Sequence, residues 1–576
     1  MILIVFLGNV FIEYMPLPWL KATYRVGADA YSDQRKQIFA IGSMQPNEPT
    51  GEINENIQRY REFNSDLIIT ADHSFNEDWR GGLTVGNNLN QRNFQDLFAR
   101  GTILSIPDFY NLSNAASLYS SEVNSTQRTA ALFFDANIGY ANMVFLGVTG
   151  RNEWASTFGP NKTNFFYPSV NTSFIFTELI PENKILSFGK LRYSYAQVGI
   201  NPPPYRTKTY FVSPTFTDGF TNGLSFPYLG QGGFGFSDVL GNANLEPEKT
   251  TGNEVGLDLR FLNGRLNVDF TYYNQLSEQI LVFRPIAPSS GFESVYSNSG
   301  KMRNSGIELV VDGDIIKNKN FTWNLAVNFT KNKNEVLELA EGVDEVSVLA
   351  AFTSIGSYAI VGDAYGALYG TRWLRNDAGD LIIGANGLPK VDPLRGNIGN
   401  PFPDWTMGIN NSFNYKGINL SFLFDIREGG DLWNGTLARI YQYGLPEETV
   451  NRNQKYIIPG VKEDGTPNDK EIDARTYFSN YWGDRGGAAV EQAIYDGSWI
   501  RLRELTLSYR FNTKAKLPLV QYIDLSFTGR NLWLSTDYPG VDPETSLTGA
   551  GTNLNGFDYF NNPGTKSYIF GLKIGI

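Results

Sequence analysis

The sequence predicts an all-β protein, a transmembrane antiparallel β-barrel. The first observation is a strict alternation of apolar and polar residues, which is clearest in Glu254–Tyr273, on both sides of Asn263-Gly264. Period-two alternation is typical of a strand with one apolar face, and Asn-Gly supplies the positive φ angles of a two-residue hairpin turn. The second observation is that such hairpins recur to the last residue. So many strands need a way to protect their sheet edges, and closing into a barrel provides one.

The composition favours a sheet that lies between lipid and water. Charged residues make up 19% of the 576 residues, and the chain contains 31 Tyr, 40 Phe and 58 Gly; soluble domains average about 25% charged residues. No run of about 18 apolar residues is present, which excludes transmembrane helices. Barrel strands remain possible, because each needs only about 9–11 residues to cross the membrane.

Several functional classes are disfavoured by residues that the chain lacks. It has no Cys and a single His, His73, so thiol chemistry, disulfides and most zinc sites are not expected. A net charge of −11 argues against nucleic acid as a partner. Asp72-His73-Ser74 invites a hydrolase interpretation, but consecutive strand residues point to opposite faces and do not form a triad.

We expect about 17 strands, taken in order along the chain, each long enough to cross an outer membrane. They pair across short turns, and a last strand covers residues 566–576. The hairpins are 9–16 with 18–30, 59–73 with 79–90, 126–138 with 142–154, 164–178 with 184–199, 250–262 with 265–282, 303–314 with 320–334, 403–414 with 418–430 and 496–510 with 520–532.

Long polar segments separate these hairpins and are expected to be loops. Short turns at one end and long loops at the other are typical of outer-membrane barrels, with the short turns in the periplasm. A complete barrel of about 22 strands has a plugged lumen. We therefore expect residues 1–576 to be one incomplete barrel domain, the carboxy-terminal part, with the plug and about five strands lying upstream. The expected loops are 31–58, 91–125, 200–249, 283–302, 335–402, 431–495 and 535–565.

Two strands have special features. The alternation slips between Ile500 and Tyr509, and a β-bulge at Arg503-Glu504 would return the apolar residues to one face. The closing strand resembles the terminal signal read by the barrel-assembly machinery, although it ends in Ile where an aromatic residue is more usual. Its apolar face consists of Tyr568, Phe570, Leu572, Ile574 and Ile576.

Several segments, in matching order and spacing, resemble the SusC/RagA branch of the TonB-dependent outer-membrane transporters of Bacteroidetes. Examples are Lys190-Leu-Arg-Tyr-Ser-Tyr-Ala-Gln-Val-Gly199 and Asn244-Leu-Glu-Pro-Glu-Lys-Thr-Thr251. The other matches are Arg151–Thr157, Tyr167–Val170, Gly256–Leu259, Asn298–Glu308, Gly399–Trp405, Tyr495–Leu505, Gly529–Trp533 and Gly540–Glu544.

The resemblance implies a nutrient importer without enzymatic activity or cofactor. It implies a 22-stranded barrel with an amino-terminal plug, a SusD-like surface lipoprotein and energy from the TonB complex. The cargo would be oligosaccharides or oligopeptides, and the sequence does not distinguish them. The alternatives are a plugless passive pore, a structural or adhesin barrel and, least favoured, an outer-membrane hydrolase.

Two groups of residues are candidates for function. Aromatic rings in the 200–249 loop stack on sugars or anchor protein contacts, so we expect them to contact substrate or the lipoprotein, or else to pack on one another. These are Tyr205, Tyr210, Phe211, Phe216, Phe220 and Tyr228. The polar strand faces are expected to line the lumen, either as substrate contacts or as a structural ion-pair network. These residues are Glu254, Asp258, Arg260, Asp269, Glu308, Asp312 and Asp425.

Overall fold

The computed structural model describes residues 2–43, 49–161, 163–181, 183–212, 215–216, 224–226, 228–483, 488–512, 519–548, 552 and 554–575. Two compact units are present. Unit 1 comprises Met1–Phe174, Tyr193–Gly252 and Ser277–Gly300, and unit 2 comprises Ile175–Arg192, Asn253–Leu276 and Lys301–Ile576. Among the described residues, eighteen strands belong to one sheet.

The seventeen predicted strands are confirmed. The eighteenth strand of the sheet is β13 (Val239–Leu240), which pairs in parallel with β16. The long strands are β1 (Ile2–Leu17), β2 (Leu20–Phe39), β3 (Glu52–Ser74), β4 (Trp79–Leu104), β5 (Ala115–Tyr140), β6 (Val144–Ala155), β7 (Asn164–Ile175), β8 (Leu186–Ile200), β14 (Glu248–Phe261), β15 (Leu266–Pro285), β16 (Ser294–Lys317), β17 (Phe321–Glu338), β23 (Trp405–Tyr415), β24 (Ile418–Glu428), β30 (Trp499–Asn512), β31 (Tyr522–Ser535) and β33 (Ser567–Gly575).

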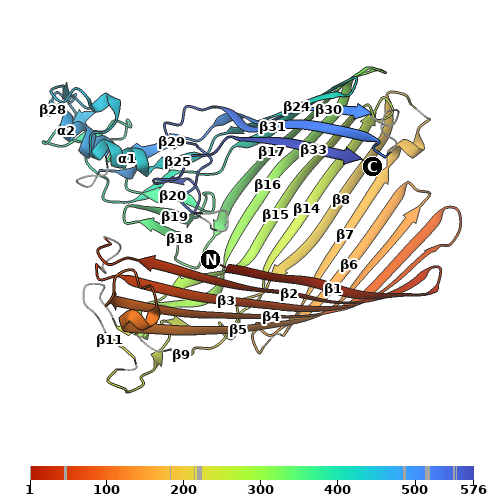
Figure 1. Ribbon diagram of the computed structural model, residues 1–576, viewed down its shortest axis with the longest axis horizontal. Coiled ribbons are helices and arrows are strands. Elements are labelled where there is room, and N and C mark those ends of the chain that lie inside the picture. Colours follow the sequence, from red (N-terminus) through yellow and green to blue (C-terminus); the bar gives the residue numbers. More distant parts are fainter. Residues whose placement is uncertain are drawn as a thin grey trace. The chain divides into compact units, whose positions relative to one another are not determined.

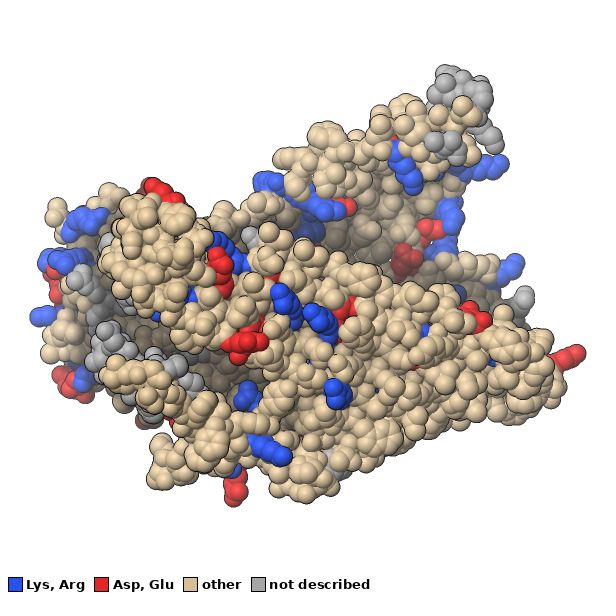
Figure 2. Space-filling view, turned by 60° about the horizontal axis from the view of Figure 1, so that its bottom comes forward, with Lys and Arg blue, Asp and Glu red and all other residues tan. Residues whose placement is uncertain are grey.

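Strands β1 to β7 of unit 1 form an antiparallel meander, in which each strand pairs with the next along the chain (Figure 1). The predicted alternation is visible in β3, where Phe63, Leu67 and Ile69 are exposed and Asp66 is buried. Figure 2 shows a broad face on which residues other than Lys, Arg, Asp and Glu predominate. Exposed apolar side chains in such numbers indicate a sheet face that contacts lipid.

Two of the predicted loops are mostly strand. Residues 31–58 and 91–125 were expected to be irregular, but β2 and β4 continue to Phe39 and Leu104, and β3 and β5 begin at Glu52 and Ala115. The physical reason is that polar residues occupy both faces of these extensions with apolar residues scattered among them, so the alternation stops although the backbone ladder continues. Gln58 still pairs with Asp96, and Gln95 with Asn124.

Of two local predictions about the backbone, the bulge is confirmed, whereas the turn at Asn263-Gly264 has the expected positive φ angles but not the expected length of two residues. Asn263 and Gly264 both have positive φ, but Leu262 does as well, so the turn between β14 and β15 is longer than two residues. In the ladder between β24 and β30, Leu423 pairs with Glu504 and Phe424 pairs with Leu502. Arg503 of β30 is therefore the extra residue of a bulge.

The segments predicted as polar loops after β17 fold into a region with its own core in unit 2. Two of its sheets have more than two strands. One consists of β18 (Glu345–Phe352), β19 (Ile355–Ile360), β20 (Ala367–Gly370) and β22 (Gly396–Gly399). The other consists of β25 (Asp431–Asn434), β29 (Ile494–Asp496) and β32 (Phe557–Asp558). Helix α1 (Gly435–Gln442) begins where the Asn434 side chain accepts a hydrogen bond from the Leu437 N–H at 2.8 Å.

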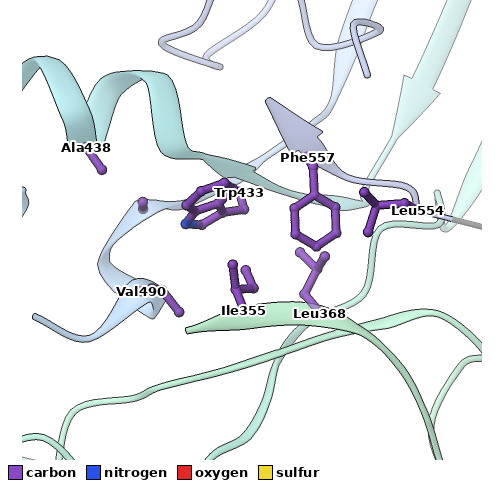
Figure 3. Close-up of a cluster of buried hydrophobic side chains, with 8 residues drawn as sticks. Ile355, Leu368, Trp433, Ala438, Val490, Leu554 and Phe557 are labelled. Carbon is purple, nitrogen blue, oxygen red and sulfur yellow. The ribbon is translucent and has the colours of Figure 1, made fainter. Parts of the chain in front are cut away.

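Eight buried side chains, which we call the loop core, hold this region together. Phe557 lies between Trp433, Leu368 and Leu554 (Figure 3), and its side chain is 0% exposed. The Trp433 ring also stacks on Tyr559 with centroids 6.0 Å apart. The prediction that residues 335–402, 431–495 and 535–565 are simply polar loops is therefore wrong. The loop core comprises Ile355, Leu368, Trp433, Ala438, Val490, Ala493, Leu554 and Phe557.

The remaining elements are short. They are η1 (Leu112–Asn114), η2 (Phe176–Leu179), η3 (Pro288–Ser290), η4 (Glu447–Thr449), η5 (Tyr477–Trp482), η6 (Val490–Ala493), α2 (Ala474–Thr476), β9 (Phe211–Val212), β10 (Thr215–Phe216), β11 (Leu224–Ser225), β12 (Gly235–Phe236), β21 (Ile382–Ile383), β26 (Lys455–Tyr456), β27 (Val461–Lys462) and β28 (Ile472–Asp473). None of the helices in the described part of the chain is long and apolar enough to span a membrane.

Candidate functional site

The polar face of the unit 1 strands carries a network centred on Asp66. The Arg25 guanidinium donates to the Asp66 carboxylate at 2.8 and 3.1 Å, and the amides of Asn64 and Asn88 donate to it at 2.8 and 2.7 Å. Asp66 is 5% exposed, so these partners satisfy a buried charge. The network ties β2, β3 and β4 together on the face opposite the exposed apolar residues.

In unit 2, the residues predicted to line the lumen are largely engaged with one another or with a neighbouring arginine. Arg192 donates to both oxygens of Asp269, at 2.9 and 2.5 Å, and to the Thr271 hydroxyl at 2.8 Å. Asp258 lies 3.6 Å from Arg260, whose guanidinium lies 4.6 Å from the centre of the Phe188 ring.

The remaining predicted lumen residues differ in their surroundings. Glu254 contributes, with Asp258, to the negative field at Arg192. Asp312 accepts a 3.3 Å hydrogen bond from the Asn267 amide, and Glu308 lies opposite Thr330 across β16 and β17. These contacts fit the structural ion-pair interpretation of the wall; substrate contact stays a prediction.

The seventh predicted residue, Asp425, belongs to a cluster that the sequence did not reveal. Arg503 donates to Asp425 at 2.7 Å and to Glu544 at 2.7 Å. Arg501 forms a two-pronged pair with Asp542 at 2.6 and 3.2 Å, in which the two side chains are only 5% and 9% exposed. The cluster fastens the segment after β31 to β24 and β30.

The bulge helps to bring both arginines to this cluster. Bulges redirect side chains, and both guanidinium groups lie against the Trp499 ring, 5.2 and 5.3 Å from its centre. A signal was present in the sequence: Arg501 and Arg503 have the same spacing as Asp542 and Glu544, within two of the family-like segments.

The predicted aromatic loop is brought together only in part. Tyr205 and Tyr210 form an edge-to-face pair with centroids 6.1 Å apart, and the Tyr205 hydroxyl accepts a hydrogen bond from the Thr126 N–H. Phe211 stacks on Phe236 at 4.6 Å, and these two side chains are 65% and 61% exposed.

The other residues of this group are separate or outside the described part. Tyr228 is half exposed and forms an isolated bridge with Gln231. Phe216 lies in the two-residue strand β10, and Phe220 lies outside the described residues. The loop thus packs partly on itself and still presents exposed rings, so both interpretations of the aromatic residues retain support.

The closing strand presents the apolar face that the sequence predicts. Tyr568, Phe570, Leu572 and Ile574 are exposed, while Ile576 lies outside the described residues. Phe570 pairs with Phe527 of β31, with ring centroids 5.2 Å apart. The role of this face as an assembly signal stays a prediction.

The alternative chemistries receive no support from the geometry. Asp72 pairs with Arg80 at 3.0 Å, whereas His73 contacts the Trp19 and Phe75 rings, so the two side chains are engaged separately. Within the described residues, no group of three His, Cys, Asp or Glu side chains is placed to hold a metal ion. Asp464 instead caps a turn through the Thr466 side chain and N–H, and these hydrogen bonds lower the pKa of its carboxyl.

Comparison with known proteins identifies this architecture. The family model described as "TonB dependent receptor-like, beta-barrel" matches residues 16–532. The chain belongs to this family. Its β-barrel fold and its location in the bacterial outer membrane, both expected from the sequence, are thereby confirmed.

Curated relatives agree with this assignment. TonB-dependent receptor P3 of Formosa agariphila is 28% identical over 526 residues, which cover 83% of this chain and 48% of that protein. TonB-dependent receptor SusC of Bacteroides thetaiotaomicron is 25% identical over 353 residues, covering 58% of this chain and 32% of that protein. The chain therefore spans about half the length of the P3 receptor that it matches.

The fold is also that of solved transporters. The RagAB peptide importer in its "closed-closed" state superposes with a TM-score of 0.76 at 20% identity, covering 98% of this chain and 61% of that chain. The structure titled "Structure of the RagAB peptide transporter" gives a TM-score of 0.74 at 20% identity, with the same coverage of both chains. These proteins are named as receptors, transporters and importers.

Proposed function

We propose that this chain forms wall strands of a SusC/RagA-type nutrient importer, which takes up oligosaccharides or oligopeptides with a SusD-like surface lipoprotein and energy from the TonB complex. The observation that carries the proposal is the match to the TonB-dependent receptor barrel over residues 16–532. SusC among the relatives and the RagAB likeness over 98% of the chain support this branch of the family.

In this proposal the barrel wall is a firm scaffold. Arg25 with Asp66 joins the neighbouring strands β2 and β3, and Arg192 with Asp269 joins β8 and β15 across β14. Because these are hydrogen-bonded ion pairs, the polar wall does not depend on bound cargo for its charge balance. In the importer, a plug within the lumen contacts TonB, and this chain supplies strands of the wall. Transport then proceeds by binding, occlusion and passage.

Contacts with cargo or the lipoprotein are assigned to the exposed rings of the 200–249 loop. Tyr205, Tyr210, Phe211 and Tyr228 offer flat apolar faces, and the three tyrosines add hydroxyl groups. Such rings stack on sugars and also anchor peptide or protein partners, so they serve either cargo class.

An uptake assay tests the proposal and distinguishes the cargo. The gene is deleted in the native host, and accumulation of fluorescent oligopeptides and oligosaccharides is measured with and without complementation. We expect one cargo class to depend on the gene and to fall severalfold in Phe211→Ala/Phe236→Ala. The matched control is Leu132→Ala, an exposed apolar residue of β5, which should transport normally.

Heat-dependent migration in gels shows whether each variant has folded. Uptake of both cargo classes that does not change on deletion of the gene would contradict the importer proposal. Normal uptake by the folded double variant would instead remove the loop aromatics from the site and leave the importer intact.

A further inference from the structure

A groove of about 480 Å³ lies on the outward face of unit 1. It is formed by β2 to β6, and its apolar lining is well exposed: Phe63 is 52% and Leu89 49% exposed. One cationic side chain, Arg128, is among its lining residues. The principal lining residues are Val26, Phe63, Leu89, Arg128, Ala130 and Trp154.

The strand register places these residues on one face. Phe63 lies opposite Gln91, which lies opposite Arg128. In the next row, Leu89 lies opposite Ala130, which lies opposite Trp154. Side chains directly opposite one another in a ladder share a face, and residues two apart on a strand share it as well.

The groove lies where this face changes from apolar to basic. Toward the short turns, the same face continues with the exposed apolar residues Val85 and Phe134. In the other direction it continues with Arg61 and Arg59, both exposed. Such a change along an outward face marks the boundary between hydrocarbon and headgroups.

The length of strand β5 also places the groove at the boundary between hydrocarbon and headgroups. Near the short turn, Trp79 of β4 pairs with Tyr140 of β5, with ring centroids 4.7 Å apart, as expected of an interfacial aromatic girdle. Arg128 is twelve residues further along β5. At about 3.3 Å per residue and a tilt of about 40°, this rises roughly 30 Å, which takes Arg128 just beyond an apolar band about 25 Å tall.

Arg128 is held in place without being neutralised. Its Nε donates to the Gln91 side-chain oxygen at 2.9 Å, and the backbone N–H of Arg128 donates to the Ser156 hydroxyl at 2.9 Å. Neither Arg128 nor Arg59 or Arg61 takes part in an ion pair found among the described residues. Lys36, on the same face, differs because it lies 2.8 Å from Glu55.

We propose that this groove binds a phosphorylated lipid of the outer leaflet. An acyl chain lies along Phe63, Leu89 and Trp154, and the lipid phosphate is bound by the free guanidinium N–H groups of Arg128, supported by Arg61 and Arg59. A guanidinium fork is well suited to phosphate oxygens, and the volume accommodates a chain segment. The proposal rests on the outer-membrane location and does not depend on import or on its cargo.

Native mass spectrometry of the detergent-solubilised full chain tests this proposal. The added probes are diphosphorylated lipid A and the same lipid without its phosphates. Heat-dependent gel migration first shows that each protein is folded. The experiment then compares wild type, Arg128→Gln, the triple variant Arg59→Gln/Arg61→Gln/Arg128→Gln and the matched control Lys36→Gln.

We expect the phosphorylated lipid to bind wild type and Lys36→Gln alike and to bind Arg128→Gln about tenfold more weakly, as for the loss of a charge-assisted contact. The triple variant should bind it more weakly still, at the level of the lipid without phosphates. The proposal would be overturned if wild type bound both lipids equally, or if Arg128→Gln bound the phosphorylated lipid as tightly as wild type. It would also be overturned if a second copy of the chain, without lipid, covered this face.

Discussion

The lipid-facing strands of unit 1 and the loop core of unit 2 are built on opposite principles. On β3, apolar residues at every second position are exposed while polar Asp66 is buried among hydrogen-bonding partners. In the loop core, apolar Phe557, Ile355 and Leu368 are buried, as in a soluble domain.

This difference shows that one region of the chain folds against lipid and the other folds in water. Lipid accepts apolar side chains, so in the wall the backbone ladder and buried polar groups supply the specific interactions. Water does not accept them, so the loop region needs a hydrophobic core of its own. Substitutions of the same chemical kind should therefore have opposite effects in the two regions.

The largest effect should come from Phe557→Ala. Removing this fully buried ring should cost the loop region about 3–5 kcal/mol, because it leaves a cavity between Trp433 and Leu368. Limited proteolysis should then cut within residues 335–402 and 431–495, while the strand wall keeps its heat-dependent gel migration. Phe560→Ala, an exposed ring nearby, is the control, and equal protease resistance of both variants would refute the idea of a separate core.

Next in size is Asp542→Ala, which removes the principal partner of the buried Arg501 guanidinium. Loss of one member of a buried pair costs about 3–5 kcal/mol, and the lower end is expected here because Glu544 remains 3.1 Å away. Hydrogen exchange should accelerate in the segment after β31. The exposed Asp537, changed to Ala, should leave exchange unaltered; unchanged exchange in Asp542→Ala would show that the pair does not fasten this segment.

On the wall, Val85→Arg should destabilise by about 2–4 kcal/mol, because a charge enters the middle of the apolar band. Asn93→Arg, on the same face of β4 but at headgroup height, should cost only about 0–1 kcal/mol. Urea unfolding in lipid vesicles measures both values. Equal costs at the two positions would mean that this face does not contact lipid.

The smallest effect concerns pH. Burial raises the pKa of the Asp431 carboxyl, and the charges of Asp496 and Asp404 raise this pKa further. A 2.7 Å hydrogen bond from the Asn400 N–H lowers the same pKa and so opposes these effects. The folded state thus binds this proton more tightly than the unfolded state, so stability declines as pH rises from the ordinary carboxyl pKa through the raised one.

Asp431→Asn should remove this slope in the loop region. Asp464→Asn should remove a slope of the opposite sign, because the pKa of Asp464 is lowered by its hydrogen bonds to Thr466. Guanidinium unfolding of the loop region between about pH 3.5 and 7 measures both slopes, and a slope that persists in Asp431→Asn would assign it to another group.

The strands of the wall could be predicted from the sequence, whereas the loop core could not. The period of two reveals β3 to β6 directly, and the slip of that period correctly marks the bulge at Arg503. The partner of Asp66 depends on strand register, because Arg25 lies 41 residues away. The loop core has no period, since Leu368, Trp433 and Phe557 come from three short strands that lie far apart in the sequence.

The candidate site was predictable only at the level of residue type. Exposed aromatic rings are present in the 200–249 loop, yet the stacked partner of Phe211 is Phe236, through the pairing of β9 with β12. Arg192 was overlooked because a strand arginine carries no sign of its partner. Its contact with Asp269 depends on the sheet topology, which places β8 and β15 on the two sides of β14.

The most direct test of TonB-driven import is whether gene-dependent uptake needs energy from the inner membrane. Accumulation of labelled oligopeptides and oligosaccharides is compared in cells with and without the gene, before and after an ionophore collapses the proton gradient that drives TonB. TonB-driven import predicts uptake that requires the gene and stops with the ionophore. Gene-dependent entry that continues unchanged after the ionophore would contradict it and identify a passive pore.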